Sequence, residues 1–134
     1  MAFGTFDNFH PGHNSYLSQA GVFGNEIFVI IARDENVLKI KGHLPQENED
    51  VRRQKVESAL KDLNLNGEAR LGNLEDRWQV VREVRPDFIC LGYDQQVDFE
   101  ALKELISKER FFCEIRRLEP FYPEKYKSSI LRDN

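Results

Sequence analysis

A chain of 134 residues with 40% hydrophobic and 31% charged residues has the size and composition of one globular domain, which excludes a disordered or fibrous protein. Its 19 basic and 23 acidic residues argue against a polymeric nucleic acid as partner, because such proteins normally carry a basic surplus. No apolar stretch reaches the roughly 20 residues that span a membrane, and no secretion signal is recognisable. We therefore expect one domain at residues 1–134, located in the cytoplasm without membrane contact.

The first expected element is a strand at residues 1–3, which is short for the centre of a sheet. A helix follows, with Tyr16, Leu17 and Ala20 at helical spacing. The apolar run at residues 27–32 has the length and β-branched content of a buried parallel strand.

Residues 33–42 come next and are expected to be an extended loop that carries Lys39 and Lys41. Alternate side chains of an extended segment project to one side, so both lysines would face the same ligand. Such cations can follow charge that moves during phosphoryl transfer. The alternative is that both are ordinary solvated lysines. The charged stretch 46–53 reads as a loop that runs into a helix.

The second half of the chain continues the alternation, with a helix near residues 78–84, a strand at 88–91, a helix near 99–106 and a last strand at 113–115. This pattern predicts an α/β fold: a single Rossmann-like domain with an about five-stranded parallel sheet and helices on both faces. Ligands then bind at the carboxyl ends of the strands. Cys90 and Cys113 lie in apolar runs outside any metal pattern and are expected to be buried free thiols.

The strongest chemical signal is the segment 4–13, Gly-Thr-Phe-Asp-Asn-Phe-His-Pro-Gly-His, between the first strand and the first helix. Pro11 suits a first helical turn, Gly12 lets a ligand approach the backbone, and the helix dipole favours an anion there. His10 and His13 share one face of a helical turn and can donate to the same phosphoryl oxygens. A metal pair or two solvated histidines are the alternatives.

This segment resembles the signature of the cytidylyltransferase-like nucleotidyltransferases, a GTFD turn followed by an HxGH tetrad. The resemblance implies that His10 and His13 hold a nucleoside triphosphate and stabilise its α-phosphate under attack. It also implies nucleotide contacts for the turn residues Thr5 and Phe6 and for Gly12. The lysine-bearing segment would lie over the acceptor and the triphosphate.

Two further segments fit the same family. Gly92 and Asp94 follow an apolar strand, where the family places a Gly-x-Asp segment against base and ribose; an ordinary turn is the alternative. Ser128 and Ser129 read as helix N-caps, and with Arg132 they form a possible anion cradle that the family uses for the β- and γ-phosphates. The predicted final helix is barely a turn long, so this grip is expected to be loose or completed by a partner subunit.

The implied reaction needs no covalent nucleophile on the protein, because the acceptor's own phosphate oxygen can attack the α-phosphorus. Mg²⁺ is the expected cofactor, bound through substrate phosphates rather than through a protein cage. No residue is named as a metal ligand. Asp7 is either an outer contact of that ion or a structural turn residue.

Details at residues 71–73, 85–95 and 124–129 look more like archaeal-type FAD synthases than like glycerol-3-phosphate cytidylyltransferases. The favoured reaction is therefore ATP plus FMN giving FAD and pyrophosphate. CTP with glycerol 3-phosphate is the alternative, since base choice rests on a few backbone contacts. A nucleotide-binding module without catalysis is the second alternative, motivated by the short first strand and the short final helix. A homodimer would match the family's habit.

Overall fold

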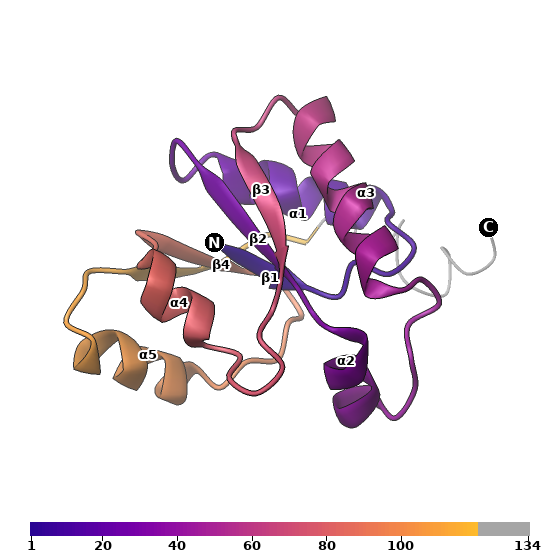
Figure 1. Ribbon diagram of the computed structural model, residues 1–134. Coiled ribbons are helices and arrows are strands. Elements are labelled where there is room, and N and C mark those ends of the chain that lie inside the picture. The colour runs from indigo at the N-terminus through magenta and orange to yellow at the C-terminus, as the bar shows by residue number, and fades with distance from the viewer. Residues whose placement is uncertain (121–134) are drawn as a thin grey trace.

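Five parallel strands form one sheet in the order β3-β2-β1-β4-β5 within residues 1–120, the part of the chain that this computed structural model describes (Figure 1). The strands are β1 (Ala2–Gly4), β2 (Ile27–Ile31), β3 (Gly67–Leu71), β4 (Phe88–Leu91) and β5 (Glu114–Arg117). The helices are α1 (Pro11–Gly21), α2 (Asp34–Lys41), α3 (Glu49–Asp62), α4 (Gln79–Val84) and α5 (Phe99–Lys108). The predicted Rossmann-like α/β fold is confirmed.

Two hydrophobic cores lie on the two faces of the sheet, because successive strand residues point to opposite sides. Val29 and Ile31 of β2 belong to the core formed with α1 and α3, whereas Ile30 belongs to the core formed with α4 and α5. Figure 1 shows these two helix pairs on opposite sides of the sheet. No helix in the described part of the chain is long and apolar enough to cross a membrane.

Residues 34–41 form the helix α2, so the predicted extended loop is wrong. Acidic side chains in its first turn and basic ones in its last turn complement the helix dipole. Gly42 ends the helix with a φ of 81°, a left-handed conformation that glycine adopts without strain. Residues two apart on a helix point in different directions, so Lys39 and Lys41 do not share a face.

The edge strand β3 was not located from the sequence. Of its five residues only Ala69 is buried, so it lacks an apolar run. Glu68 and Arg70 form an ion pair with each other on its other face. An edge strand with one buried residue carries too weak a hydrophobic pattern to be recognised locally.

β1 has three residues, and a crevice opens beside it at its carboxyl end. β1 pairs with β2 at three positions but with β4 only through Ala2 and Cys90. Beyond that pair the chain leaves β1 toward α1 on one face and leaves β4 toward α5 on the other. Ligands of open α/β sheets bind at such a switch point, outside the carboxyl ends of the strands.

Both cysteines are free, as predicted, but only Cys90 is fully buried, while Cys113 is half-buried. Burial raises the pKa of both thiols, that of Cys113 to about 11. Neither thiol is therefore an activated nucleophile at neutral pH.

Candidate active site

A cavity of about 380 Å³ opens at the carboxyl ends of β1 and β4, at the switch point between these two strands. Its walls come from the loop after β1, the start of α1, the segment formed by α2 and residues 42–48, and the turn after β4. The lining residues are Phe3, Gly4, Thr5, Phe6, Asp7, His10, His13, Tyr16, Val37, Lys41, His43, Pro45, Gly92, Asp94 and Gln95.

The loop after β1 is held in place by the buried ring of Phe6, which is 2% exposed. Phe6 has a φ of 55°, a conformation that is strained for a side-chain-bearing residue. Its ring stacks near those of Phe9 and Tyr16 and meets the edge of His13. A Cβ on Gly4 would lie 2.7 Å from this ring, so glycine is required there. Burial of the aromatic ring thus offsets the backbone strain of the loop.

His10 and His13 cap the first turn of α1, and their rings stack with centroids 3.7 Å apart. The Gly12 backbone N–H donates to His10 Nδ1 at 3.0 Å, and the His10 backbone N–H donates to His13 Nδ1 at 3.3 Å. Because both Nδ1 atoms accept, a neutral ring must carry its proton on Nε2. Each histidine can therefore offer an Nε2–H donor at the cavity.

Burial keeps both imidazoles neutral. It lowers the pKa of His10, and together with the neighbouring His10 ring it lowers the pKa of His13 to about 3, although Asp7 acts in the opposite direction. At neutral pH the pair thus supplies hydrogen-bond donors without positive charge.

Gly12 takes part in this arrangement through its own backbone. The Gly12 N–H donates to His10 Nδ1, and a Cβ added to Gly12 would lie 2.8 Å from His10 Cε1. Gly12 does not line the cavity. The structure thus gives it a role in holding His10, while its predicted contact with the nucleotide stays a prediction.

The two lysines of α2 are separated by the helix. Lys41 lines the cavity together with Val37, one turn earlier on the same face. Lys39 lies outside the lining and forms an exposed pair with Glu35, with 3.9 Å between Nζ and Oε1. The structure therefore brings only Lys41 to the histidine pair.

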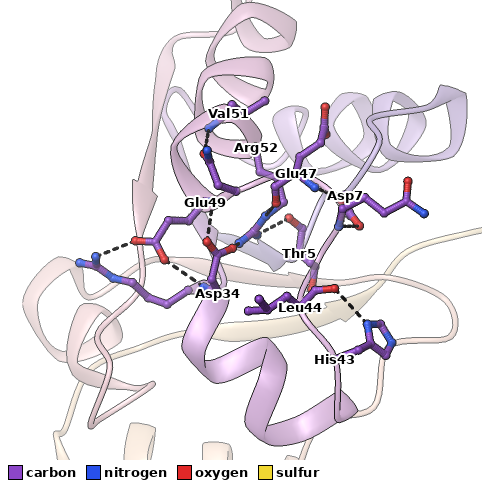
Figure 2. Close-up of polar contacts among 12 residues, drawn as sticks. Thr5, Asp7, Asp34, His43, Leu44, Glu47, Glu49, Val51 and Arg52 are labelled. Atoms are coloured by element: carbon purple, nitrogen blue, oxygen red, sulfur yellow. Dashed lines mark hydrogen bonds and ion pairs between the residues drawn. The ribbon is translucent and has the colours of Figure 1, made fainter.

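Arg52 is a residue that the sequence reasoning missed. Its side chain is fully buried and donates to Thr5 O at 2.8 Å, to Asp34 Oδ1 at 2.7 Å and to Glu47 O at 3.1 Å (Figure 2). The sequence contains a signal for the burial of Arg52, because it shares the apolar face of α3 with Val56 and Ala59, at positions i, i+4 and i+7.

Asp7 is a structural turn residue. Its two carboxylate oxygens accept from the backbone N–H groups of Gln46 and Glu47, at 2.8 and 3.0 Å (Figure 2). The neighbouring Asn8 backbone N–H donates to Glu47 Oε1 at 2.9 Å. These bonds attach residues 42–48, which include the cavity residues His43 and Pro45, to the loop after β1.

The turn after β4 completes the cavity. Gly92 and Asp94 line it, while their predicted contact with base and ribose stays a prediction, and Gln95 and Tyr16 line it as well, although neither was predicted. The Arg117 guanidinium Nη1 donates to Gly92 O and to Gln95 O, at 2.7 and 2.6 Å, and so holds the turn from β5.

Three predicted contacts, Ser128, Ser129 and Arg132, lie outside the described residues. Within residues 1–120, no three His, Cys, Asp or Glu side chains come together in a way that could hold a metal ion.

Comparisons with known proteins give matches over most of the chain. The sequence model of the cytidylyltransferase-like family matches residues 1–134. FAD synthase from Aciduliprofundum boonei is 42% identical over 121 residues, which cover 90% of this chain and 78% of that protein. FAD synthase from Methanosarcina mazei is 43% identical over 119 residues, which cover 88% and 74%. A crystal structure described as the lipopolysaccharide core biosynthesis protein from Thermoplasma volcanium matches with a TM-score of 0.79 and 36% identity, covering 90% of this chain and 95% of that one.

Replacing Arg52 by methionine should destabilise the protein by about 3–5 kcal/mol, because two carbonyls and the Asp34 carboxylate lose a buried donor. Arg53→Met is the matched control, since Arg53 forms a partly exposed pair with Glu57 at 3.6 Å and should contribute less than about 1 kcal/mol. Urea unfolding followed by circular dichroism measures both. Equal losses in the two variants would contradict the assignment.

The histidine pair should make stability depend on pH. The pKa of His13 is about 3 in the folded chain against an ordinary 6.5, so its stabilising effect is present above pH 6.5 and is lost as the pH falls toward 3. The free energy of unfolding should then decline by up to about 1.4 kcal/mol per pH unit from this group. His13→Asn, which keeps an acceptor for the His10 N–H, should show a shallower decline between pH 6.5 and 4.5. Identical slopes would contradict burial of a neutral imidazole.

Proposed function

The chain belongs to the cytidylyltransferase-like family of nucleotidyltransferases, and we propose that it transfers the adenylyl group of ATP to FMN, giving FAD and pyrophosphate. The observation that carries the choice of substrates is the 42–43% identity, over about nine tenths of the chain, to proteins named FAD synthase. The stacked, neutral histidine pair at the strand switch point supports the chemistry.

In the proposed reaction, a phosphate oxygen of FMN attacks the α-phosphorus of ATP. A new P–O bond forms, the bond from the α-phosphorus to the bridging oxygen breaks, and pyrophosphate leaves with the electron pair. The Nε2–H groups of His10 and His13 donate to α-phosphoryl oxygens, whose hydrogen bonding strengthens in the transition state. Their fixed Nδ1 contacts support this role, because the rings need no reorientation when the substrate binds.

Lys41 supplies the positive charge that the neutral histidines lack. It lies at the end of α2 on the cavity wall, so its ammonium group can follow charge moving from the acceptor to the leaving pyrophosphate. Lys39, which the sequence places beside it, is assigned no such role here, because it pairs with Glu35 outside the cavity.

The same wall suits an aromatic acceptor. Ile40 and Leu44 are 77% and 58% exposed, and each directly precedes a residue that lines the cavity, Lys41 and Pro45, although neither lines it itself. Exposed apolar side chains beside a cavity can cover a planar flavin ring, whereas glycerol 3-phosphate offers no comparable apolar surface. This observation favours FMN as the acceptor.

Mg²⁺ bound through substrate phosphates belongs to the same proposal. Both carboxylate oxygens of Asp7 are occupied by backbone N–H groups, which fits an ion whose ligands come from the substrate. When bound, the ion would neutralise triphosphate charge.

Ser128, Ser129 and Arg132 are proposed to contact the triphosphate tail. A homodimer is also proposed, as is a cytoplasmic location, which two free cysteines support.

A pyrophosphate-release assay that crosses ATP and CTP with FMN and glycerol 3-phosphate tests the proposal. Release only with ATP and FMN, together with FAD detected by chromatography, is the expected result. Release with CTP and glycerol 3-phosphate would instead identify a glycerol-3-phosphate cytidylyltransferase. Nucleotide binding without release in any combination would identify a non-catalytic module.

Replacing His10 or His13 by alanine should lower kcat by about two to four orders of magnitude, because each loses a preorganised donor to the reacting phosphate. His43→Ala is the control: His43 borders the same cavity but is exposed, and within residues 1–120 its side chain hydrogen-bonds only with the neighbouring Leu44 carbonyl. It should change kcat by less than about tenfold. Normal turnover in a folded variant lacking both His10 and His13 would overturn the mechanism.

Lys41→Ala and Lys39→Ala should separate the two lysines. Loss of Lys41 should lower kcat by about 10- to 100-fold with a smaller effect on ATP affinity, since its charge acts mainly in the transition state. Loss of Lys39 should change kcat by less than about twofold, as expected for an exposed i,i+4 pair. Steady-state rates at saturating ATP and FMN decide, and equal effects would show that helix geometry does not select the catalytic lysine.

A further inference from the structure

Tyr16 and Gln95 join β1 to β4 at the point where the two strands stop pairing. Within residues 1–120 the strands share one parallel pair, Ala2 with Cys90, and its bond from Cys90 N–H to Met1 O is 2.9 Å long. In a parallel sheet, alternate residues of a strand bond to the same neighbour, so the N–H and C=O of Phe3 are the next groups to point toward β4. The register places the Phe3 N–H opposite Cys90 O, and because the strands diverge beyond that point, the Phe3 C=O needs another partner.

Side chains take the place of the missing strand. The Phe3 N–H donates to the Tyr16 hydroxyl at 3.2 Å. That hydroxyl can donate to three oxygens: Cys90 O at 2.7 Å, Phe3 O at 3.2 Å and Gln95 Oε1 at 3.5 Å. Gln95 Nε2 donates to Phe3 O at 2.9 Å, while Gln95 Oε1 accepts from the Gly92 N–H at 3.0 Å. Both backbone groups of Phe3 are thus satisfied, and the turn after β4 is tied to β1.

The surroundings of these two side chains stabilise the arrangement. Burial raises the pKa of Tyr16 far above its ordinary value, so its hydroxyl remains a donor at any physiological pH. On the other side of the turn, Arg117 holds Gly92 O and Gln95 O, with its guanidinium 5.1 Å from the Phe99 ring. The turn is therefore fixed from β1 and from β5 at once.

We propose that Tyr16 and Gln95 are a positioning pair, the Tyr16–Gln95 bridge, which sets Gly92 and Asp94 against the nucleoside part of the bound nucleotide. This inference rests on the proposed function, because that function assigns Gly92 and Asp94 to the nucleotide. Within the described part of the chain, the bridge bonds to β1 and to the turn and forms no hydrogen bond with His10 or His13. Its loss should therefore weaken nucleotide binding much more than it slows the chemical step.

The test measures ATP binding by calorimetry without FMN, and kcat and KM with both substrates, for Gln95→Leu and Tyr16→Phe. Gln79→Leu is the matched control, since Gln79 lies on α4 and its side chain donates to the exposed Glu83 and, within residues 1–120, to no other group. Gln95→Leu should raise the Kd for ATP about tenfold and Tyr16→Phe about fivefold, with kcat within about threefold and the KM for FMN within about twofold. Gln79→Leu should match the parent protein.

The double variant adds a second readout. Both substitutions break one bridge, so their combined effect on the Kd should be smaller than the product of the separate effects. Circular dichroism establishes that each variant is folded, and Tyr16→Phe keeps the buried ring in case Gln95→Leu does not fold.

Three results would overturn the bridge: a Kd for ATP within about twofold of the parent in both folded single variants, a fall in kcat at unchanged Kd, or separate effects that multiply. Failure of the proposed function is recognised separately, because a parent protein that binds ATP but forms no FAD still reports on the bridge through calorimetry. A parent protein that binds no nucleotide would overturn both.

Discussion

One guanidinium, that of Arg52, fixes three segments that are far apart in the sequence. A buried cation is stable only with full hydrogen bonding, and here its partners are a carbonyl of the loop after β1, a carboxylate at the start of α2 and a carbonyl just before α3. The loop after β1 leads directly into the histidine pair, and α2 carries Lys41. Together with the bonds of Asp7 to residues 46 and 47, this side chain fixes the relative position of the neutral donors and the positive charge in the cavity.

A second constraint arises from the crevice itself. A site between two parallel strands exists only if the strands separate, and separation removes hydrogen bonds that the sheet would otherwise make. In this chain Tyr16 and Gln95 supply those bonds, so the floor of the cavity is polar but satisfied. The opening that admits a ligand is thus stabilised by side chains rather than by the sheet, and the same side chains set the turn that borders it.

Two kinds of group determine the electrostatics of the cavity: neutral hydrogen-bond donors and a positive charge. Burial favours neutral imidazoles, which provide directional N–H donors at fixed positions, and Lys41 on the wall provides charge. Residues 1–120 contribute few cations to the cavity lining that could contact a bound triphosphate. This arrangement is consistent with a metal ion arriving with the substrate and with further contacts from later in the chain.

The sequence by itself determined what depends on local spacing: the alternation of strands and helices, the short first strand, the two histidines on one helical turn, and the Gly92–Asp94 turn. Only the tertiary structure decided that α2 is a helix, which separates Lys39 from Lys41, and that the weakly apolar β3 closes one edge of the sheet. It alone also revealed Arg52, Tyr16 and Gln95, whose partners lie 47, 74 and 92 residues away. Hydrogen bonds between such distant segments leave no periodic pattern in the chain, because the partners are brought together by folding of the sheet.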